Sequence, residues 1–344
     1  MKKLAFLVIL IIFVFGLSGI YTVTASTTSS FSPIEIEPPN EILFTIPVGE
    51  DGIHYAGEDN PDVMRWGPTA MAVAPDGSFW IADTADNRLI HFSPKGELLE
   101  KIPTIDFIVG IGDLLVTSKD IWVLDMASFP AKVVQMAFDG KLLNAYDLPK
   151  GLRLENSLSG IALGTDGSIL VEQGGGAIIT RFISPTGKRE QTVLDGYDYS
   201  GNFYLASPAN LREEDTSSGL ILIGDKQIEI KVENDLAGLN IIQINSDGGF
   251  FVEVVEMILD SAFRIDQKVY RYGSSGNLIG MARVPRAAEY VYVEHGIVAG
   301  PDNEVYALIT KPKIAEVQKL IFVEKLAALL SKPEENITPT KRNP

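Results

Sequence analysis

The sequence contains no cysteine. This absence excludes disulfide bonds, a cysteine nucleophile and a lipid-modified cysteine. Stability must therefore come from packing, and a chain of 344 residues is long enough to bury a large core. Because no long break in composition divides the chain, we expect one large domain.

Basic residues are scarce relative to acidic ones. The chain has 29 lysines and arginines against 45 aspartates and glutamates, and its formal net charge is −16. Removing residues 1–25, which carry two lysines and no acid, would change that charge to −18. A protein that binds a phosphate backbone needs a basic stripe, so the composition argues against a nucleic-acid partner. The negative charge favours solubility and is compatible with cations or basic ligands.

Short catalytic and phosphate-binding motifs are also missing. The sequence has no G-x-S-x-G nucleophile elbow and no glycine loop that would hold a phosphate. The glycine run "EQGGGAI", which begins at Glu172, is predicted to be a tight or flexible connection between strands.

The one long apolar run lies at the N-terminus. It reads "LAFLVILIIFVFGLSGI", follows Lys2 and Lys3, and ends before small residues at positions 23–25. This pattern predicts an export signal over 1–25 and a location outside the cytoplasmic membrane. An uncleaved membrane anchor is the alternative, because the run is nearly the roughly 20 residues that span a bilayer. Residues 26–40 are predicted to be a Ser/Thr/Pro tether, and residues 324–344 a short helix and tail.

The rest of the chain consists of repeats. The stretch "GPTAMAVAPDGSFWIADTADNRLIHFSPKGELLEKIP", residues 67–103, is predicted to contain four strands with tight Asp-Gly or Gly-containing turns. Its second strand has relatives along the chain, and the middle position of these strands is aromatic in five of six copies. The six middle residues are Trp80, Trp122, Leu170, Tyr204, Phe251 and Tyr306.

The spacing of these copies predicts the architecture. The shortest interval, from Leu170 to Tyr204, is 34 residues, and the longest, from Phe251 to Tyr306, is 55. These intervals bracket the roughly 40 to 50 residues of a four-stranded propeller blade. We therefore predict an all-β, six-bladed β-propeller of four-stranded antiparallel blades over residues 41–323, with the middle residues buried between blades.

The sixth copy lacks a fourth strand. Its third strand is predicted over 317–322, and no further strand follows it. The segment "NEILFTIP", residues 40–47, has the fourth-strand pattern with no earlier strands before it. We predict that this N-terminal strand pairs with the sixth copy and closes the ring, which removes exposed sheet edges.

The first copy resembles an NHL repeat. The residues that carry the resemblance are Pro68, Asp76, Gly77, Asp83, Asn87 and Arg88. Later copies match loosely, since Asp125 keeps the aspartate while Gln173, Ser207, Val254 and Ile309 occupy that position elsewhere. The resemblance implies the propeller superfamily that includes gluconolactonase-like and streptogramin lyase-like proteins. It also implies a structural role for Asp83, Asn87 and Arg88, which in the family tie the loop between the second and third strands.

Ligands of propellers generally bind where the loops into the innermost strands and the loops after the second strands meet. We expect the segment 54–68 to form a lid or binding edge over the channel. The residues that the alignment places on this face, and that we expect to contact a ligand, are Arg65, Trp66, Asp83, Asp125, Gln173 and Asn240.

Two kinds of chemistry are candidates at this face. An oxygen-rich calcium site would use Asp83, Asp125 and Glu172. However, when the copies are aligned, Glu172 and Glu253 lie one position away from the residue that corresponds to Asp83. Their side chains should therefore point to the opposite side of the strand, so no clean acidic ring is predicted. Among the three histidines only His295, beside Glu294, is placed for acid-base catalysis, and a structural role for it is the alternative.

Two classes of function remain. The first is a non-catalytic, monomeric exported propeller that binds a protein, glycan or peptide through its loop-bearing face. The second is a divalent-cation-dependent lactonase-like or lyase-like enzyme. Because few titratable groups are clearly gathered on one face, the sequence favours binding.

Overall fold

The computed structural model describes residues 40–324, except 59, 61, 150–157, 209–215, 260–262 and 286–288. The predicted export signal, the predicted tether up to residue 39 and the predicted tail from residue 325 lie outside the described residues. Within the described part of the chain, no helix is long and apolar enough to cross a membrane.

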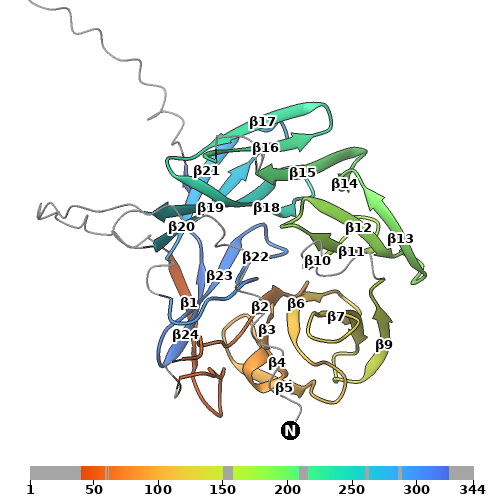
Figure 1. Ribbon diagram of the computed structural model, residues 1–344, viewed down its shortest axis with the longest axis vertical. Coiled ribbons are helices and arrows are strands. Elements are labelled where there is room, and N and C mark those ends of the chain that lie inside the picture. Colours follow the sequence, from red (N-terminus) through yellow and green to blue (C-terminus); the bar gives the residue numbers. More distant parts are fainter. Residues whose placement is uncertain are drawn as a thin grey trace, which may run out of the picture. The chain divides into compact units, whose positions relative to one another are not determined.

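The described chain forms the predicted all-β propeller with six antiparallel blades of four strands (Figure 1). The innermost strands lie around the centre: β2 (Ala70–Val73), β6 (Ile111–Val116), β10 (Leu158–Leu163), β14 (Tyr197–Tyr199), β18 (Asp235–Ile244) and β22 (Ile297–Ala299). The second strands are β3 (Phe79–Asp83), β7 (Ile121–Asp125), β11 (Ile169–Gln173), β15 (Asn202–Pro208), β19 (Phe250–Leu259) and β23 (Val305–Thr310). Every predicted middle residue lies in one of these second strands.

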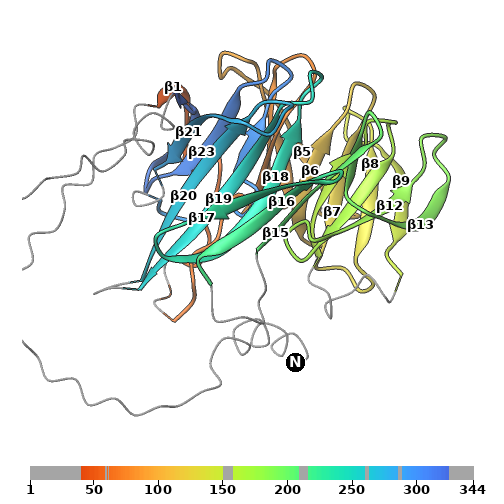
Figure 2. The ribbon, with the colours of Figure 1, turned by 90° about the horizontal axis from the view of Figure 1, so that it is seen from above.

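The third and outer strands complete each blade. The third strands are β4 (Arg88–Phe92), β8 (Lys132–Met136), β12 (Ile178–Ile183), β16 (Ser218–Ile223), β20 (Phe263–Tyr272) and β24 (Ile314–Lys319). The outer strands are β5 (Leu98–Pro103), β9 (Leu142–Asp147), β13 (Arg189–Leu194), β17 (Lys226–Lys231), β21 (Leu278–Val284) and, for the sixth blade, β1 (Glu41–Pro47). The blades are numbered 1 to 6 from β2 onward, and Figure 2 shows them from the side.

The N-terminal strand closes the ring, as predicted. β1 pairs antiparallel with β24, with Phe44 opposite Val317 and Ile46 opposite Ala315. In Figure 1 the red-orange β1 lies beside the blue β24. The third strand begins at Ile314, three residues before the predicted start, because a tight turn with a 2.8 Å hydrogen bond from the Lys311 N–H to the Ile314 carbonyl returns the chain immediately.

The core lies between neighbouring blades. Trp80 of blade 1 packs with Val123 and Val134 of blade 2, and Tyr306 of blade 6 packs with Phe79 and Ile81 of blade 1. Trp122, Tyr204 and Phe251 likewise join clusters shared with the next blade. All six predicted middle residues are buried. Large aromatic side chains thus fill the wedge-shaped space between twisted sheets.

Blade 5 differs from the others. Its strands β18, β19 and β20 have ten residues each, and β25 (Val323–Glu324) pairs with its outer strand β21, which gives a five-stranded sheet. Neither feature was predicted. The additional pairing covers part of the outer edge of this blade, where unpaired backbone groups would otherwise be exposed.

Candidate functional site

The loops that lead into the innermost strands and the loops between second and third strands share one face. Backbone hydrogen bonds join them directly: the Thr104 N–H donates to the Asn87 carbonyl at 2.8 Å, and the Leu148 N–H donates to the Ala131 carbonyl at 2.7 Å. We call this side of the ring the loop-bearing face. Its loops are therefore held in place by the blades on both sides.

Asp83 ties the loops of blade 1 together. Its fully buried carboxylate accepts hydrogen bonds from the Arg88 Nε at 2.8 Å and from the backbone N–H of His54 at 3.0 Å. The Arg88 guanidinium also donates to the Gly52 carbonyl at 2.7 Å. Burial raises the pKa of Asp83 despite these hydrogen bonds and the positive charge of Arg88. This geometry matches the structural role that the NHL-like pattern implies.

Asp125 holds the loops of blade 2 in the same way, with different hydrogen-bond partners. Its buried carboxylate accepts hydrogen bonds from the N–H groups of Val109, Gly110 and Ser128, each at 3.1 Å, and from the Ser128 hydroxyl at 2.5 Å. Three backbone donors on one carboxylate fix the conformation of the adjoining loop. Asp83 and Asp125 therefore point into their own blades, and Gln173 of blade 3 is also buried.

Other acidic residues converge at the centre. Asp113 on β6 and Glu172 on β11 lie on either side of Gly160 of β10. A Cβ atom at residue 160 would lie 3.0 Å from the Asp113 Oδ2 and 3.0 Å from the Glu172 Oε2, so a larger residue there would press against both carboxylates. Asp113 accepts hydrogen bonds from the N–H groups of Ile161 at 2.8 Å and Leu114 at 2.7 Å.

Glu172 is a half-buried carboxyl group with a tyrosine partner. The Tyr197 hydroxyl at the start of β14 donates a hydrogen bond to the Glu172 Oε1. Burial raises the pKa of Glu172 to about 7, the Tyr197 hydrogen bond opposes this rise, and the nearby charge of Asp113 adds to it. Burial likewise raises the pKa of Asp113. Glu172 can therefore take up or release a proton near neutral pH.

His295 completes this group from the loop before β22. Its Nδ1 lies 3.8 Å from the Asp113 Oδ1, and its Nε2 is buried without a hydrogen-bond partner among the described residues. Burial alone would lower the pKa of His295, but the charges of Asp113, Glu294, Glu172 and Glu253 together raise it. Backbone hydrogen bonds of 2.9 Å to Thr69 and Met71 hold this residue against blade 1.

Blade 5 contributes an amide and a further carboxylate. The Asn240 Nδ2 donates to the Glu253 Oε2 at 3.1 Å, and Gln267 donates to the other oxygen of Glu253. Gly175, with a left-handed φ of +65°, lies so close that a Cβ there would be 3.0 Å from the Asn240 Oδ1. The glycine run after β11 is thus a tight connection that reaches Asn240. We call the converging side chains the channel cluster: Asp113, Glu172, Tyr197, Asn240, Glu253 and His295.

Of the three residues of the expected calcium site, only Glu172 belongs to the channel cluster. Asp83 and Asp125 lie in different blades and are saturated by hydrogen bonds, and they do not meet Glu172. Across the described part of the chain, no three His, Asp or Glu side chains are arranged to hold a metal ion. The three residues predicted to hold calcium, Asp83, Asp125 and Glu172, are therefore not brought together.

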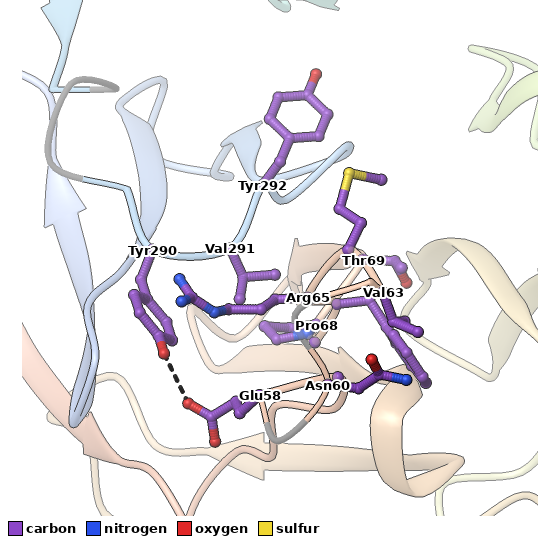
Figure 3. Close-up of a pocket in the computed structure, with 13 residues that line it drawn as sticks. Glu58, Asn60, Val63, Arg65, Pro68, Thr69, Tyr290, Val291 and Tyr292 are labelled. Carbon is purple, nitrogen blue, oxygen red and sulfur yellow. Dashed lines mark hydrogen bonds between the residues drawn. The ribbon is translucent and has the colours of Figure 1, made fainter. Parts of the chain in front are cut away.

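A cavity of about 500 Å³ lies on the loop-bearing face between the segment before β2 and the loop before β22 (Figure 3). We call it the rim cavity. Thr69 connects it to the channel cluster, because Thr69 lines the cavity and its carbonyl accepts the N–H of His295. The residues that line the cavity are Gly57, Glu58, Asn60, Val63, Met64, Arg65, Trp66, Gly67, Pro68, Thr69, Tyr290, Val291 and Tyr292.

The polar groups of the rim cavity have a simple arrangement. Arg65 extends across the cavity toward Tyr290, and its guanidinium carbon lies 4.5 Å from the centre of the Tyr290 ring. The Tyr290 hydroxyl donates to the Glu58 Oε1 at 2.8 Å, as the dashed line in Figure 3 shows. The predicted binding edge, with Arg65 and Trp66, is therefore one wall of a cavity.

Exposed apolar side chains lie in this cavity and on other loops of the same face. Met64 and Phe129 are 81% and 76% exposed, which is unusual for large apolar residues. Others on the described loops of this face are Trp66, Ile105, Val109 and Tyr292. They come from loops at blades 6, 1 and 2, which are neighbours in the ring.

The structure brings together some of the residues that the sequence singled out, and it adds others that the sequence analysis missed. Glu172, Glu253, Asn240 and His295 come together, while the exposed Glu294 lies beside His295 and acts on it through its charge. Asp113, Tyr197 and Tyr290 were missed. A signal existed for Asp113, which is the one charged residue in the apolar run "IGDLLV".

Several solved structures of low sequence identity are similar to the chain in fold. The chain is similar in structure to a streptogramin B lyase, with 16% identity, a TM-score of 0.44 and coverage of 78% of this chain and 98% of that chain. It is also similar to a candidate gluconolactonase, with 12% identity, a TM-score of 0.42 and coverage of 76% and 91%. A member of the DUF4221 family from Bacteroides vulgatus has 9% identity, a TM-score of 0.51 and coverage of 82% and 96%. No family description and no curated protein matches the sequence.

Proposed function

We propose that this propeller is a binding protein that holds a peptide segment of a partner protein on its loop-bearing face, with the rim cavity as the anchoring site. The observation that carries the proposal is the combination of this cavity with exposed apolar side chains on the loops around it. Contiguous exposed apolar surface on a soluble protein marks sites of interaction.

The lining of the cavity favours a peptide over a glycan. Val63, Met64 and Val291 supply apolar surface, and Trp66 supplies an aromatic wall. Such a lining suits a hydrophobic side chain, which anchors peptides and proteins in pockets of this kind. The loops that form the cavity are fixed by backbone hydrogen bonds, so little ordering is needed on binding.

Selection from a random peptide display library tests this proposal. The immobilised protein should enrich peptides with a hydrophobic residue, and Trp66→Ala should weaken their binding at least tenfold, since a central aromatic anchor is worth about 2 kcal/mol or more. The matched control is Phe203→Ala. Phe203 is an exposed aromatic at the start of β15, beside the turn on the opposite face, and this change should leave binding unaltered.

The proposal fails if both variants bind the selected peptides as the unaltered protein does. It also fails if the library yields only sequences that bind the Phe203 side. In either case the apolar surface around the rim cavity would have a different role.

A second candidate function is supported by the channel cluster. Glu172, with a pKa of about 7, lies with Tyr197, Asp113 and His295 at the centre of the ring. A carboxyl group that titrates near neutral pH can act as a general acid or base. We therefore propose proton-transfer chemistry, such as lactone opening, as the alternative to simple binding.

Turnover assays with a panel of lactones distinguish the two functions. An enzyme should lose at least about a hundredfold of its rate in Glu172→Gln, since general acid-base catalysis contributes that much. A control that preserves the cluster is Glu50→Gln, which changes an exposed carboxylate on the loop after β1. Absence of turnover by the unaltered protein leaves binding as the function.

We propose that the protein works outside the cytoplasmic membrane as a monomer. The apolar run at residues 4–20, which follows two lysines, supports export. Fractionation of cells that produce the chain, together with N-terminal sequencing of the product, separates a cleaved signal from a retained anchor.

A further inference from the structure

In the described part of the chain, no carboxylate pairs with the Arg65 guanidinium. Among the described residues it forms no hydrogen bond or ion pair, and its contact is with the face of Tyr290 at 4.5 Å. The side chain is exposed in the rim cavity.

A carboxylate of the same cavity is hydrogen-bonded to Tyr290. Glu58 lines the same cavity, but its Oε1 accepts the Tyr290 hydroxyl at 2.8 Å. Tyr290 therefore orients Glu58 with its hydroxyl and Arg65 with its ring. The cation-π contact fixes the plane of the guanidinium without using any of its five N–H donors.

The surroundings of Arg65 determine what kind of anion would fit. Val63, Met64, Trp66 and Val291 line the cavity beside it, so an anion bound there would have to adjoin an apolar group. A planar guanidinium held in this way matches a carboxylate, which accepts two parallel N–H donors. A fully hydrophilic anion would leave the apolar lining uncovered.

We propose that the rim cavity recognises a peptide carboxylate next to a hydrophobic side chain, with Arg65 as the residue that pairs with the carboxylate. This inference rests on the proposed peptide-binding function and specifies its ligand. The hydrophobic side chain occupies the apolar lining near Trp66. The carboxylate is either the C-terminus of the peptide or an acidic side chain.

Matched probes separate these elements. The first pair is N-acetyl-leucyl-phenylalanine, which has a free carboxylate, and its C-terminal amide, which has none. The second pair consists of N-acetyl-Leu-Glu-Phe-amide and N-acetyl-Leu-Gln-Phe-amide, in which only the side chain differs in charge. Dissociation constants are measured by titrating each probe into ¹⁵N-labelled protein and following its amide signals.

The carboxylate form of at least one pair should bind about tenfold more tightly than its neutral partner, as expected for a charge-assisted hydrogen bond. Arg65→Gln should remove this preference and leave the neutral probe unaffected. Trp66→Ala should weaken both members of the pair. The control is Arg189→Gln, because Arg189 also lies over an aromatic ring, Phe182 at 5.4 Å, but on the outer strand of blade 3.

The possible results distinguish the role of Arg65 from the peptide-binding function. If acid and neutral probes bind equally and Trp66→Ala weakens both, the role of Arg65 is refuted while the peptide-binding function stands. If neither pair shifts the signals of the rim cavity, both claims fail. If the preference for the carboxylate persists in Arg65→Gln, the anion binds elsewhere and the inference is overturned.

Discussion

In this propeller, structural carboxylates and carboxylates of the channel cluster differ by one position along the second strand. Asp83 and Asp125 end their second strands and point into the loops of their own blades. Glu172 and Glu253 occur one position earlier on theirs and point to the centre. Successive side chains of a strand point to opposite faces, so this offset is enough to change the role of the carboxylate.

The first prediction concerns Asp83. Asp83→Ala leaves the Arg88 guanidinium and the His54 N–H without their buried acceptor, so the free energy of unfolding should fall by about 3 kcal/mol. Chemical denaturation measures the loss. Asp106→Ala, which removes an exposed carboxylate from a loop of the same face, should change stability by less than about 0.5 kcal/mol. Equal losses in the two variants would contradict the structural role of Asp83.

The second prediction concerns the pH dependence of stability. The pKa values of Glu172, Asp113 and His295 are all raised in the folded state, so the folded protein binds more protons than the unfolded chain. Stability should therefore fall as the pH rises, and Glu172 contributes between its ordinary pKa of 4.5 and about 7. Glu172→Gln keeps an acceptor for Tyr197 but cannot ionise, so the decline should become shallower.

Urea denaturation midpoints measured between pH 4.5 and 8 test this point. Glu50→Gln, at an exposed position, should reproduce the slope of the unaltered protein. A slope in Glu172→Gln as steep as in the unaltered protein would show that Glu172 does not hold its proton in the folded state.

Individual site residues were only partly predictable from the sequence. His295 and Asn240 could be found because the second strands of their blades, which contain Tyr306 and Phe251, fix where the innermost strands begin. Tyr197 could not, because the innermost strand of blade 4 has only three residues and the repeat pattern is weak there. Arg65 and Trp66 were predicted from their place before the first blade, but Tyr290, which positions Arg65, comes from the other end of the chain.

At the level of elements, β1 determines whether the ring closes. The strand pairs with β24 along most of its length, and a register shift lies between Ile42 and Phe44. Ile46 is completely buried in the cluster shared by blades 6 and 1, whereas Ile42 of the same strand is 51% exposed. The strand therefore contributes both backbone pairing and core packing.

The third prediction uses this contrast. Ile46→Ala should lower the free energy of unfolding by about 2 to 5 kcal/mol, because it leaves a cavity at the closure of the ring. Ile42→Ala removes the same atoms from an exposed position and should cost less than about 0.5 kcal/mol. Denaturation curves of the two variants provide the measurement. Similar stabilities would mean that β1 is not part of the core.

The positions of the strands were predicted more accurately from the sequence than their lengths and ends. Turn residues such as Asp76 and Gly77 mark each hairpin locally, because the Asp76 carboxylate accepts the Ser78 N–H and Gly77 adopts a φ of +84°. The ten-residue strands of blade 5 and the pairing of β25 with β21 have no such local signal. They depend on contacts between distant segments, which a repeat pattern does not encode.

For the whole molecule, the distribution of surface groups favours recognition over simple solubility. The chain is strongly acidic, yet Met64 and Trp66 are exposed in the lining of the rim cavity, Phe129 is exposed on another loop of the same face, and Arg65 has no ion-pair partner among the described residues. The acidic charge should repel nucleic acids and anionic membranes while leaving this apolar face available. A partner protein with an exposed hydrophobic segment fits this surface.

The most direct test of this account uses the three tryptophans of the chain. Trp66 is 44% exposed in the rim cavity, while Trp80 and Trp122 are 1% and 5% exposed in the core. In protein labelled with ¹⁵N at tryptophan, each indole gives its own NMR signal. Addition of a display-selected peptide should shift the Trp66 signal and leave the two core signals in place. Tight binding with an unchanged Trp66 signal would contradict the proposed site.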